Sequence, residues 1–242
     1  MIVAESIGFA ATHSITEILG DLPGYDVSHG SQHFDLKHPV GQTPQSPQDF
    51  VSSMVASKAA GKNPVAVHTL IAPQLLKPAC DAAGVEYWLL VREPVAQIES
   101  CYAWISRSVL NGQPGHFQQV LQQSLGELTQ KKIPASLPNC LYFFACHHVL
   151  SFNFLALGMG ARAQKMEVLM SNETAFREAF GIDDDVTIPH FEDSQVHSAS
   201  HRSASEIGAL AEPDRDAIRD SYSLNLGGKI YSLPDMMRLL DY

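Results

Sequence analysis

Residues 87–102 read Tyr-Trp-Leu-Leu-Val-Arg-Glu-Pro-Val-Ala-Gln-Ile-Glu-Ser-Cys-Tyr. The apolar run that ends at Val91 is rich in aromatic and β-branched residues, which predicts a buried strand. Pro94 follows closely, and proline suits the first turn of a helix. The sequence therefore predicts a strand that ends at Val91, followed at Arg92 by the transition to a helix.

Arg92 is expected at an anion-binding position. Ligands of open α/β sheets bind outside the carboxyl ends of the strands, where helix N-termini offer amide donors. Ser100 follows eight residues later, about two helical turns, so its hydroxyl is expected on the Arg92 side of the helix. A guanidinium and a hydroxyl so placed can hold one phosphate. The same pattern also fits a helix-capping arginine and a solvent-facing serine.

The N-terminus offers a second candidate phosphate site. Residues 1–4 are predicted to form a short strand, Gly8 to Ser14 a turn of small residues, and the apolar spacing up to Gly20 a helix. A strand, a small-residue loop and a helix can bind phosphate on backbone amides. The loop lacks the Gly-Lys-Ser/Thr ending of a Walker A motif, and an ordinary tight connection has the same pattern.

Further strands and helices alternate along the chain. Strands are expected at residues 25–28, 64–69, 85–91 and 167–170, and helices at 50–60, 73–83, 94 onward, 117–128, 142–157, 172–180, 212–224 and 233–240. Such alternation predicts an α/β fold in three layers, a mainly parallel sheet with helices on both faces. Residues 39–48 are expected to form a surface loop of the kind that acts as a lid, and residues 183–205 an irregular loop.

Composition favours one globular domain over residues 1–242. The chain has 242 residues, of which 45% are hydrophobic and 17% charged, and this suits a single core. Its formal net charge is −10, with 26 acidic and 16 basic residues. An extended nucleic-acid interface is therefore not expected, and any anion site must be local. The expected partner is a small molecule, and the oligomeric state stays open, a homo-oligomer included.

Cysteine usage and hydropathy favour a cytoplasmic protein. Cys80, Cys101, Cys140 and Cys146 show no C-x-x-C spacing, and no N-terminal stretch has the order of a signal peptide. The most apolar long stretch, residues 141–159, contains two histidines and an asparagine. It is therefore predicted to be a buried helix and not a membrane span.

Three histidines follow the second predicted strand, at His29, His33 and His38. No pair has the H-E-x-x-H spacing of a helical zinc site, and the flanking glycine, serine and proline residues indicate a loop. These histidines are interpreted as part of a substrate pocket, and no metal ligand is assigned.

Three segments together resemble a known family. They are the Gly8 to Ser14 turn, the strand ending Val67-His68-Thr69-Leu70, and Val91-Arg92-Glu93-Pro94 followed by Ser100-Cys101-Tyr102. This set resembles the sulfotransferases that use 3′-phosphoadenosine 5′-phosphosulfate (PAPS), over most of residues 1–180. The resemblance implies a fold related to the P-loop nucleotide hydrolases, PAPS as co-substrate and no required metal.

The resemblance also implies nucleotide-binding residues. Arg92 and Ser100 match the residue types and spacing that the family uses on the nucleotide 3′-phosphate, and Arg202 is a weak substitute for a later basic contact. The family's 5′-phosphosulfate loop corresponds to Gly8, Phe9, Ala10, Ala11, Thr12 and His13. Here Phe9 takes the position of the family's loop cation. Losing such a charge typically costs a few kcal/mol of transition-state stabilisation, so another cation must substitute or turnover is slow or absent.

The resemblance implies a histidine base at a strand end. His68 precedes Arg92 by 24 residues, the separation found in the cytosolic branch of the family. A histidine with a pKa near 6.5 can take the proton of an acceptor hydroxyl as it attacks sulfur, without a covalent intermediate. His29 and His33 are the second choices for this base. The alternative to a catalytic role is that His68 only forms a hydrogen bond to the next loop, as a histidine at a strand end often does.

The sequence-based hypothesis is a sulfotransferase that moves a sulfuryl group from PAPS to a hydroxyl or amine of a small acceptor. One alternative is a nucleotide-binding protein without catalytic activity, because Phe9 replaces the loop cation. A less favoured alternative is an ATP-dependent small-molecule kinase, since the Walker lysine and the Mg-binding residue after it are missing.

Overall fold

The computed structural model describes residues 1–30, 46–189, 191 and 210–242. The chain separates into two compact units. The first comprises Met1–Arg92 and Leu155–His197, and the second Glu93–Phe154 and Ser198–Tyr242. The single domain over residues 1–242 stays a prediction.

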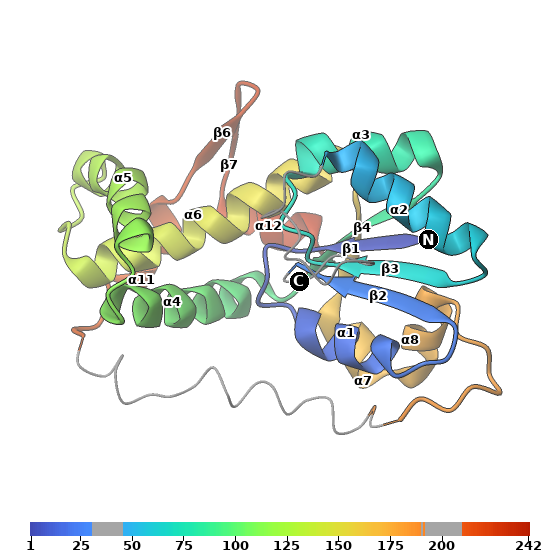
Figure 1. Ribbon diagram of the computed structural model, residues 1–242. Helices are drawn as coiled ribbons and strands as arrows, with labels where there is room; N and C mark the ends of the chain where they lie inside the picture. The colour runs from blue at the N-terminus through green and yellow to red at the C-terminus, as the bar shows by residue number, and fades with distance from the viewer. Residues whose placement is uncertain (31–45, 190, 192–209) are drawn as a thin grey trace. The chain divides into compact units, whose positions relative to one another are not determined.

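The first unit contains a five-stranded sheet (Figure 1). Its strand order is β2-β3-β1-β4-β5, and every neighbouring pair is parallel. The bounds are β1 Ile2–Glu5, β2 Tyr25–His29, β3 Asn63–Val67, β4 Glu86–Val91 and β5 Arg162–Lys165. The predicted α/β fold with a parallel sheet is confirmed.

Helices lie on both faces of this sheet. Helices α2 (Pro47–Ala59) and α3 (Pro73–Ala83) cover one face, and α1 (Thr12–Gly20), α7 (Met166–Ser171) and α8 (Glu173–Phe180) the other (Figure 1). Side chains alternate between the faces of a strand. Every second residue of β1, β3 and β4 therefore faces α1, and these residues are apolar: Ile2, Ala4, Val65, Val67, Trp88 and Leu90. They form one buried cluster with apolar side chains of α1, α7 and α8: Ile15, Ile18, Leu19, Leu169, Met170, Phe176 and Phe180.

Two strand predictions need correction. The fifth strand is not residues 167–170, which lie in helix α7, but Arg162–Lys165 directly before it. A short apolar run fits a strand or a helix turn equally well, and the real strand is a polar sheet edge without an apolar signal. The third strand also ends at Val67, before the predicted residue 69, because His68 takes a left-handed φ of 51°.

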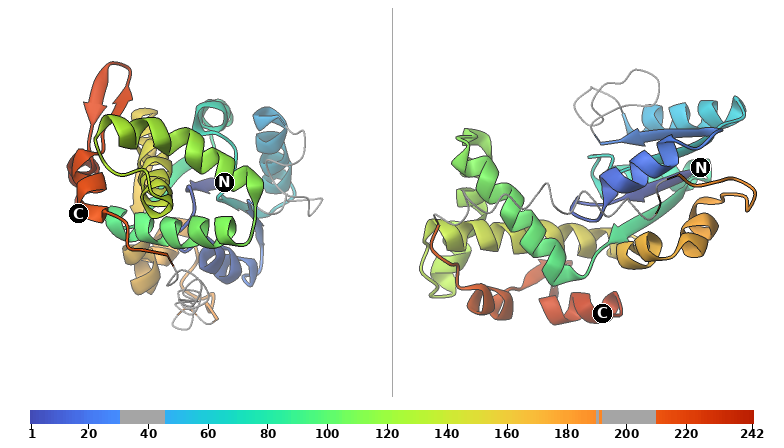
Figure 2. Two further views of the ribbon diagram at one scale, coloured as in Figure 1. Left: turned by 90° about the vertical axis from the view of Figure 1, so that its left-hand side faces the viewer. Right: turned by 90° about the horizontal axis from the view of Figure 1, so that it is seen from below.

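The second unit is mainly helical. It contains α4 (Pro94–Leu110), α5 (Pro114–Gln130), most of α6 (Leu137–Gly158), α11 (Arg215–Ser221) and α12 (Leu233–Leu239). The predicted helix over residues 212–224 is wrong at its end. Leu224 begins an antiparallel hairpin of β6 (Leu224–Leu226) and β7 (Lys229–Tyr231), which projects from the helices (Figure 2). Gly227 and Gly228, both at positive φ, form its turn. A Gly-Gly pair is typical of such a tight hairpin turn and accounts for the early end of the helix.

Helix α6 contains the apolar stretch predicted to be a buried helix. By length and composition alone it could cross a membrane, but 67% of its most apolar window is buried inside the protein. It thus has the character of a core helix. A tyrosine and a phenylalanine are among its fully buried side chains, Tyr142 and Phe144.

Candidate functional site

The candidate site lies at the carboxyl ends of β1, β2 and β3, which meet at one edge of the sheet. His29 is the last residue of β2, His68 follows β3, and His13 lies in the first turn of α1. The rings of His13 and His29 stack with their centroids 4.1 Å apart, and the centroids of His29 and His68 lie 5.4 Å apart. We call these three residues the histidine cluster.

The loop between β1 and α1 has an unusual backbone. Gly8, Phe9 and Ala11 have positive φ angles of 99°, 64° and 53°. Ala11 is the N-cap of α1 and offers no side-chain cap, while the first amides of any helix lack intrahelical partners. The loop therefore places the N-terminal end of α1, which begins at Thr12, beside the histidine cluster. The N-terminal end of a helix favours the binding of anions.

His29 is buried and contacts α1 directly. Its Nε2 atom lies 3.2 Å from the Thr12 hydroxyl, and its side chain is 8% exposed. Burial lowers the pKa of His29 to about 3, with smaller contributions from His13 and His68. His29 is therefore neutral at pH 7. Among the described residues, its buried Nδ1 has no hydrogen-bond partner.

His68 is held in one tautomer. Its Nδ1 lies 2.6 Å from the carbonyl oxygen of Ser6. Because a carbonyl only accepts, Nδ1 carries the proton and Nε2 keeps its lone pair. Burial lowers the pKa of His68, against the opposing effect of the Ser6 hydrogen bond. His68 thus presents a neutral acceptor nitrogen beside the first loop, where Gly8 approaches the ring.

Gly30 allows the chain after β2 to pass against His68. A Cβ atom at this position would lie 1.9 Å from the His68 carbonyl oxygen, and the Gly30 amide donates to Val67 O over 3.1 Å. No side chain fits in that space, so glycine is required here for steric reasons.

Glu5 is a buried carboxylate that sequence reasoning missed. Its side chain is 1% exposed and accepts hydrogen bonds from the Ser6 amide (3.0 Å), the Thr69 amide (3.0 Å) and the Thr69 hydroxyl. Burial raises the pKa of Glu5 to about 7, against the lowering effect of these bonds. The one available signal was an acidic residue at the end of an otherwise apolar strand.

The remaining predicted site residues are distributed over the chain. Arg92 follows β4 at the end of the first unit and is half-buried, whereas Ser100 lies in α4 of the second unit. Phe9 is partly buried in the first loop, and Ala10 is fully buried. His33 and Arg202 lie outside the described residues, as does most of the predicted lid loop.

Within the described ranges, no group of three or more histidine, cysteine, aspartate or glutamate side chains could hold a metal ion. His13 and His29 stack ring on ring. The histidine cluster is thus an aromatic and hydrogen-bonded assembly.

No family model, curated protein or solved structure matches this chain. Any functional assignment therefore depends on its own residues.

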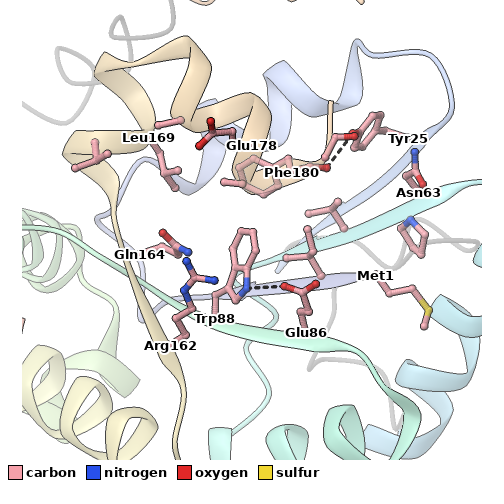
Figure 3. Close-up of a pocket in the computed structure, with 17 residues that line it drawn as sticks. Met1, Tyr25, Asn63, Glu86, Trp88, Arg162, Gln164, Leu169, Glu178 and Phe180 are labelled. Atoms are coloured by element: carbon pink, nitrogen blue, oxygen red, sulfur yellow. Dashed lines mark hydrogen bonds between the residues drawn. The ribbon is translucent and has the colours of Figure 1, made fainter. Parts of the chain in front are cut away.

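A cavity of about 510 Å³ lies at the opposite edge of the sheet, where the strands begin (Figure 3). The first residue of each strand of the five-stranded sheet lines it: Ile2, Tyr25, Asn63, Glu86 and Arg162. There Trp88 donates to Glu86 and the Tyr25 hydroxyl donates to Phe180 O. This cavity shares no residue with the histidine cluster.

Proposed function

We propose that this protein binds PAPS and transfers its sulfuryl group to a hydroxyl or amine of a small acceptor, on a three-layer fold of the P-loop type. The observation that carries the proposal is the state of His68. Its Nδ1–H is engaged by Ser6, so a neutral Nε2 acceptor stands beside a loop suited to phosphate. A base and an anion site at one sheet edge are the two parts that sulfuryl transfer needs.

In this proposal the first loop and the N-terminus of α1 bind the 5′-phosphosulfate. The amides after Gly8 and the Thr12 hydroxyl are the donors. When His29 donates through Nε2 to the Thr12 oxygen, the hydroxyl proton of Thr12 is directed to the anion. Arg92, at the carboxyl end of β4, binds the 3′-phosphate. The role of Ser100 stays a sequence-based prediction.

The reaction would proceed in one in-line step. The acceptor O–H gives its proton to Nε2 of His68 while the acceptor oxygen attacks sulfur. The bond from sulfur to the 5′-phosphate oxygen breaks, and that oxygen leaves with its electron pair on 3′-phosphoadenosine 5′-phosphate (PAP). His68 is favoured over His29 as the base, because Nε2 of His29 is occupied by Thr12 and its pKa is about 3.

One observation favours a second candidate, a protein that binds the nucleotide without turnover. Phe9 stands where the family has a cation, and neither His29 nor His68 is charged at pH 7. Without a cation near the bridging oxygen, the leaving group would be poorly stabilised. Binding through amides and Arg92 does not need that charge.

The test is PAPS turnover with the purified full chain. PAPS is incubated with a panel of phenols, alcohols and amines, and both PAP and the sulfated product are measured. The sulfotransferase assignment predicts product with at least one acceptor and its loss, by about a hundredfold or more, in His68→Ala. Nucleotide binding without any product would favour the second candidate. Full turnover in His68→Ala would contradict the base assignment.

A further inference from the structure

Glu5 has no role in the mechanism above, yet its carboxylate contacts both Ser6, which binds the His68 ring, and Thr69, which follows His68 in the chain. It ends β1 and is 1% exposed. A charged group so deeply buried is costly unless it is fully hydrogen-bonded. In the described part of the chain, the donors to Glu5 come from two neighbouring segments, the start of the first loop and the turn after β3.

On one side, Glu5 orients the residue that binds the His68 ring. Its Oε1 accepts from the Ser6 amide over 3.0 Å, and the Ser6 carbonyl accepts from His68 Nδ1 over 2.6 Å. A displacement of Glu5 would rotate or shift Ser6, and the imidazole would lose the acceptor that selects its tautomer.

On the other side, Glu5 holds the backbone directly after His68. It accepts from the amide and the hydroxyl of Thr69, and the Thr69 oxygen in turn accepts from the Ile71 amide over 3.1 Å. His68 and Leu70 both have left-handed φ angles, 51° and 63°, which are unfavourable for residues with side chains. These hydrogen bonds compensate for that conformation.

We propose that Glu5 is a positioning residue, which fixes the tautomer and orientation of His68 through Ser6 and Thr69 and so keeps Nε2 available as a proton acceptor. The catalytic use of Nε2 rests on the proposed function. The fixed tautomer of the His68 imidazole does not depend on the proposed function, and it can be measured without substrate.

The pKa of Glu5 is set by its burial and by its hydrogen bonds to Thr69 and Ser6. Two further titratable groups, Tyr87 of β4 and Cys80 of α3, respond to its charge. Burial raises both of their pKa values, and the negative charge of Glu5 raises them further, with Asp81 also contributing at Cys80. Among the described residues, the buried hydroxyl of Tyr87 has no hydrogen-bond partner. With a pKa of about 7, Glu5 changes charge near neutral pH, so the His68 tautomer is measured at pH 8, where most of Glu5 is ionised.

The experiment is NMR of the full chain labelled with ¹⁵N-histidine, recorded with long-range ¹H–¹⁵N correlations that identify imidazole tautomers. Comparison with His68→Gln assigns the His68 signals. In the wild-type protein at pH 8, His68 is expected as the Nδ1–H tautomer alone. In Glu5→Gln, the two ring nitrogens should move toward the averaged shifts of exchanging tautomers, and Glu5→Asp should restore part of the wild-type pattern.

Glu86→Gln is the matched control, because it makes the same chemical change at the amino end of β4. It should leave the His68 signals in place. An unchanged His68 tautomer in folded Glu5→Gln would overturn the proposal. If Glu5→Gln does not fold, Thr69→Val removes one donor to Glu5, together with the acceptor of the Ile71 amide. It must shift the His68 signals in the same direction for the proposal to stand.

Titration of the same samples with PAP separates the two proposals. Wild-type protein that does not bind PAP, but whose His68 tautomer depends on Glu5, contradicts the proposed function and supports the positioning role. If the protein binds PAP but the His68 tautomer is the same in wild type and Glu5→Gln, only the positioning role is contradicted.

Discussion

Nε2 of His29 lies 3.2 Å from the Thr12 hydroxyl, which joins the last residue of β2 to the first residue of α1. The contact is buried, with Thr12 5% exposed. It connects the histidine cluster to the helix end that is proposed to bind phosphate. Both side chains are therefore held in position before a ligand arrives.

Thr12→Val tests this contact with little change in shape. The valine cannot donate to an anion, so the affinity for PAP is expected to fall about tenfold, as for one lost hydrogen bond to a charged group. Thr16→Val, one turn further along α1, removes a hydroxyl that donates to a helix carbonyl and should leave the affinity unchanged. Equal affinities for Thr12→Val and wild type, measured by calorimetry, would exclude Thr12 from the binding site.

Gly30→Ala should disrupt the turn beside His68. Its Cβ would lie 1.9 Å from the His68 carbonyl oxygen, so the backbone must shift, at a cost of about 1–3 kcal/mol or more in the free energy of unfolding. Gly20→Ala is the control, because nothing lies within 4 Å of its Cβ. Urea denaturation compares the two variants. A Gly30→Ala protein as stable as wild type would show that the turn and His68 are not in direct contact.

Protonation of His29 should destabilise the fold at acidic pH. Its folded pKa, about 3, lies below the unfolded value of 6.5, so the unfolded state binds more protons between these values. The contribution of His29 to stability is thus present above pH 6.5 and falls as the pH drops toward 3, by up to a few kcal/mol at about 1.4 kcal/mol per pKa unit. In His29→Gln the free energy of unfolding should fall less steeply from pH 6.5 to 4. Parallel curves for the two proteins would show that His29 titrates normally.

Glu5 should have the opposite dependence on pH. Its folded pKa, about 7, lies above the usual 4.5, so the folded state binds the extra proton. The stability that Glu5 contributes is present below pH 4.5 and is lost as the pH rises through 7. Between pH 5 and 8 the wild-type protein should lose about 1–3 kcal/mol relative to Glu5→Gln. Thermal and urea unfolding at several pH values measure this difference, and an increase relative to Glu5→Gln over that range would contradict the buried, raised pKa.

Local signals in the sequence predicted much of the fold. Pro94 marks the start of α4, Gly84 and Gly181 end α3 and α8 in left-handed conformations, and Ser232 caps α12. These signals are local because each depends on the backbone needs of one helix end. Strand β5 was missed because an exposed edge strand need not be apolar: Arg162 is exposed and Gln164 half-buried.

The site was only partly predictable. His68 was selected from its spacing to Arg92 in the sulfotransferase resemblance, and His29 as a second choice because it follows the second predicted strand. Their proximity depends on β3 lying between β1 and β2. No sequence pattern indicates that Glu5 reaches Thr69, 64 residues later, or that Gly30 passes over His68. These relationships arise from the order of the strands, which local periodicity does not encode.

Calorimetric titration with PAP, run against ATP and repeated on Arg92→Ala, tests the central claim most directly. The account predicts micromolar binding of PAP, much weaker binding of ATP, and a loss of at least tenfold in PAP affinity in Arg92→Ala. Glu86→Gln, at the other end of β4, should bind PAP like wild type. Absence of PAP binding, or equal binding of PAP and ATP that does not depend on Arg92, would contradict the assignment of this protein as a PAPS-dependent sulfotransferase.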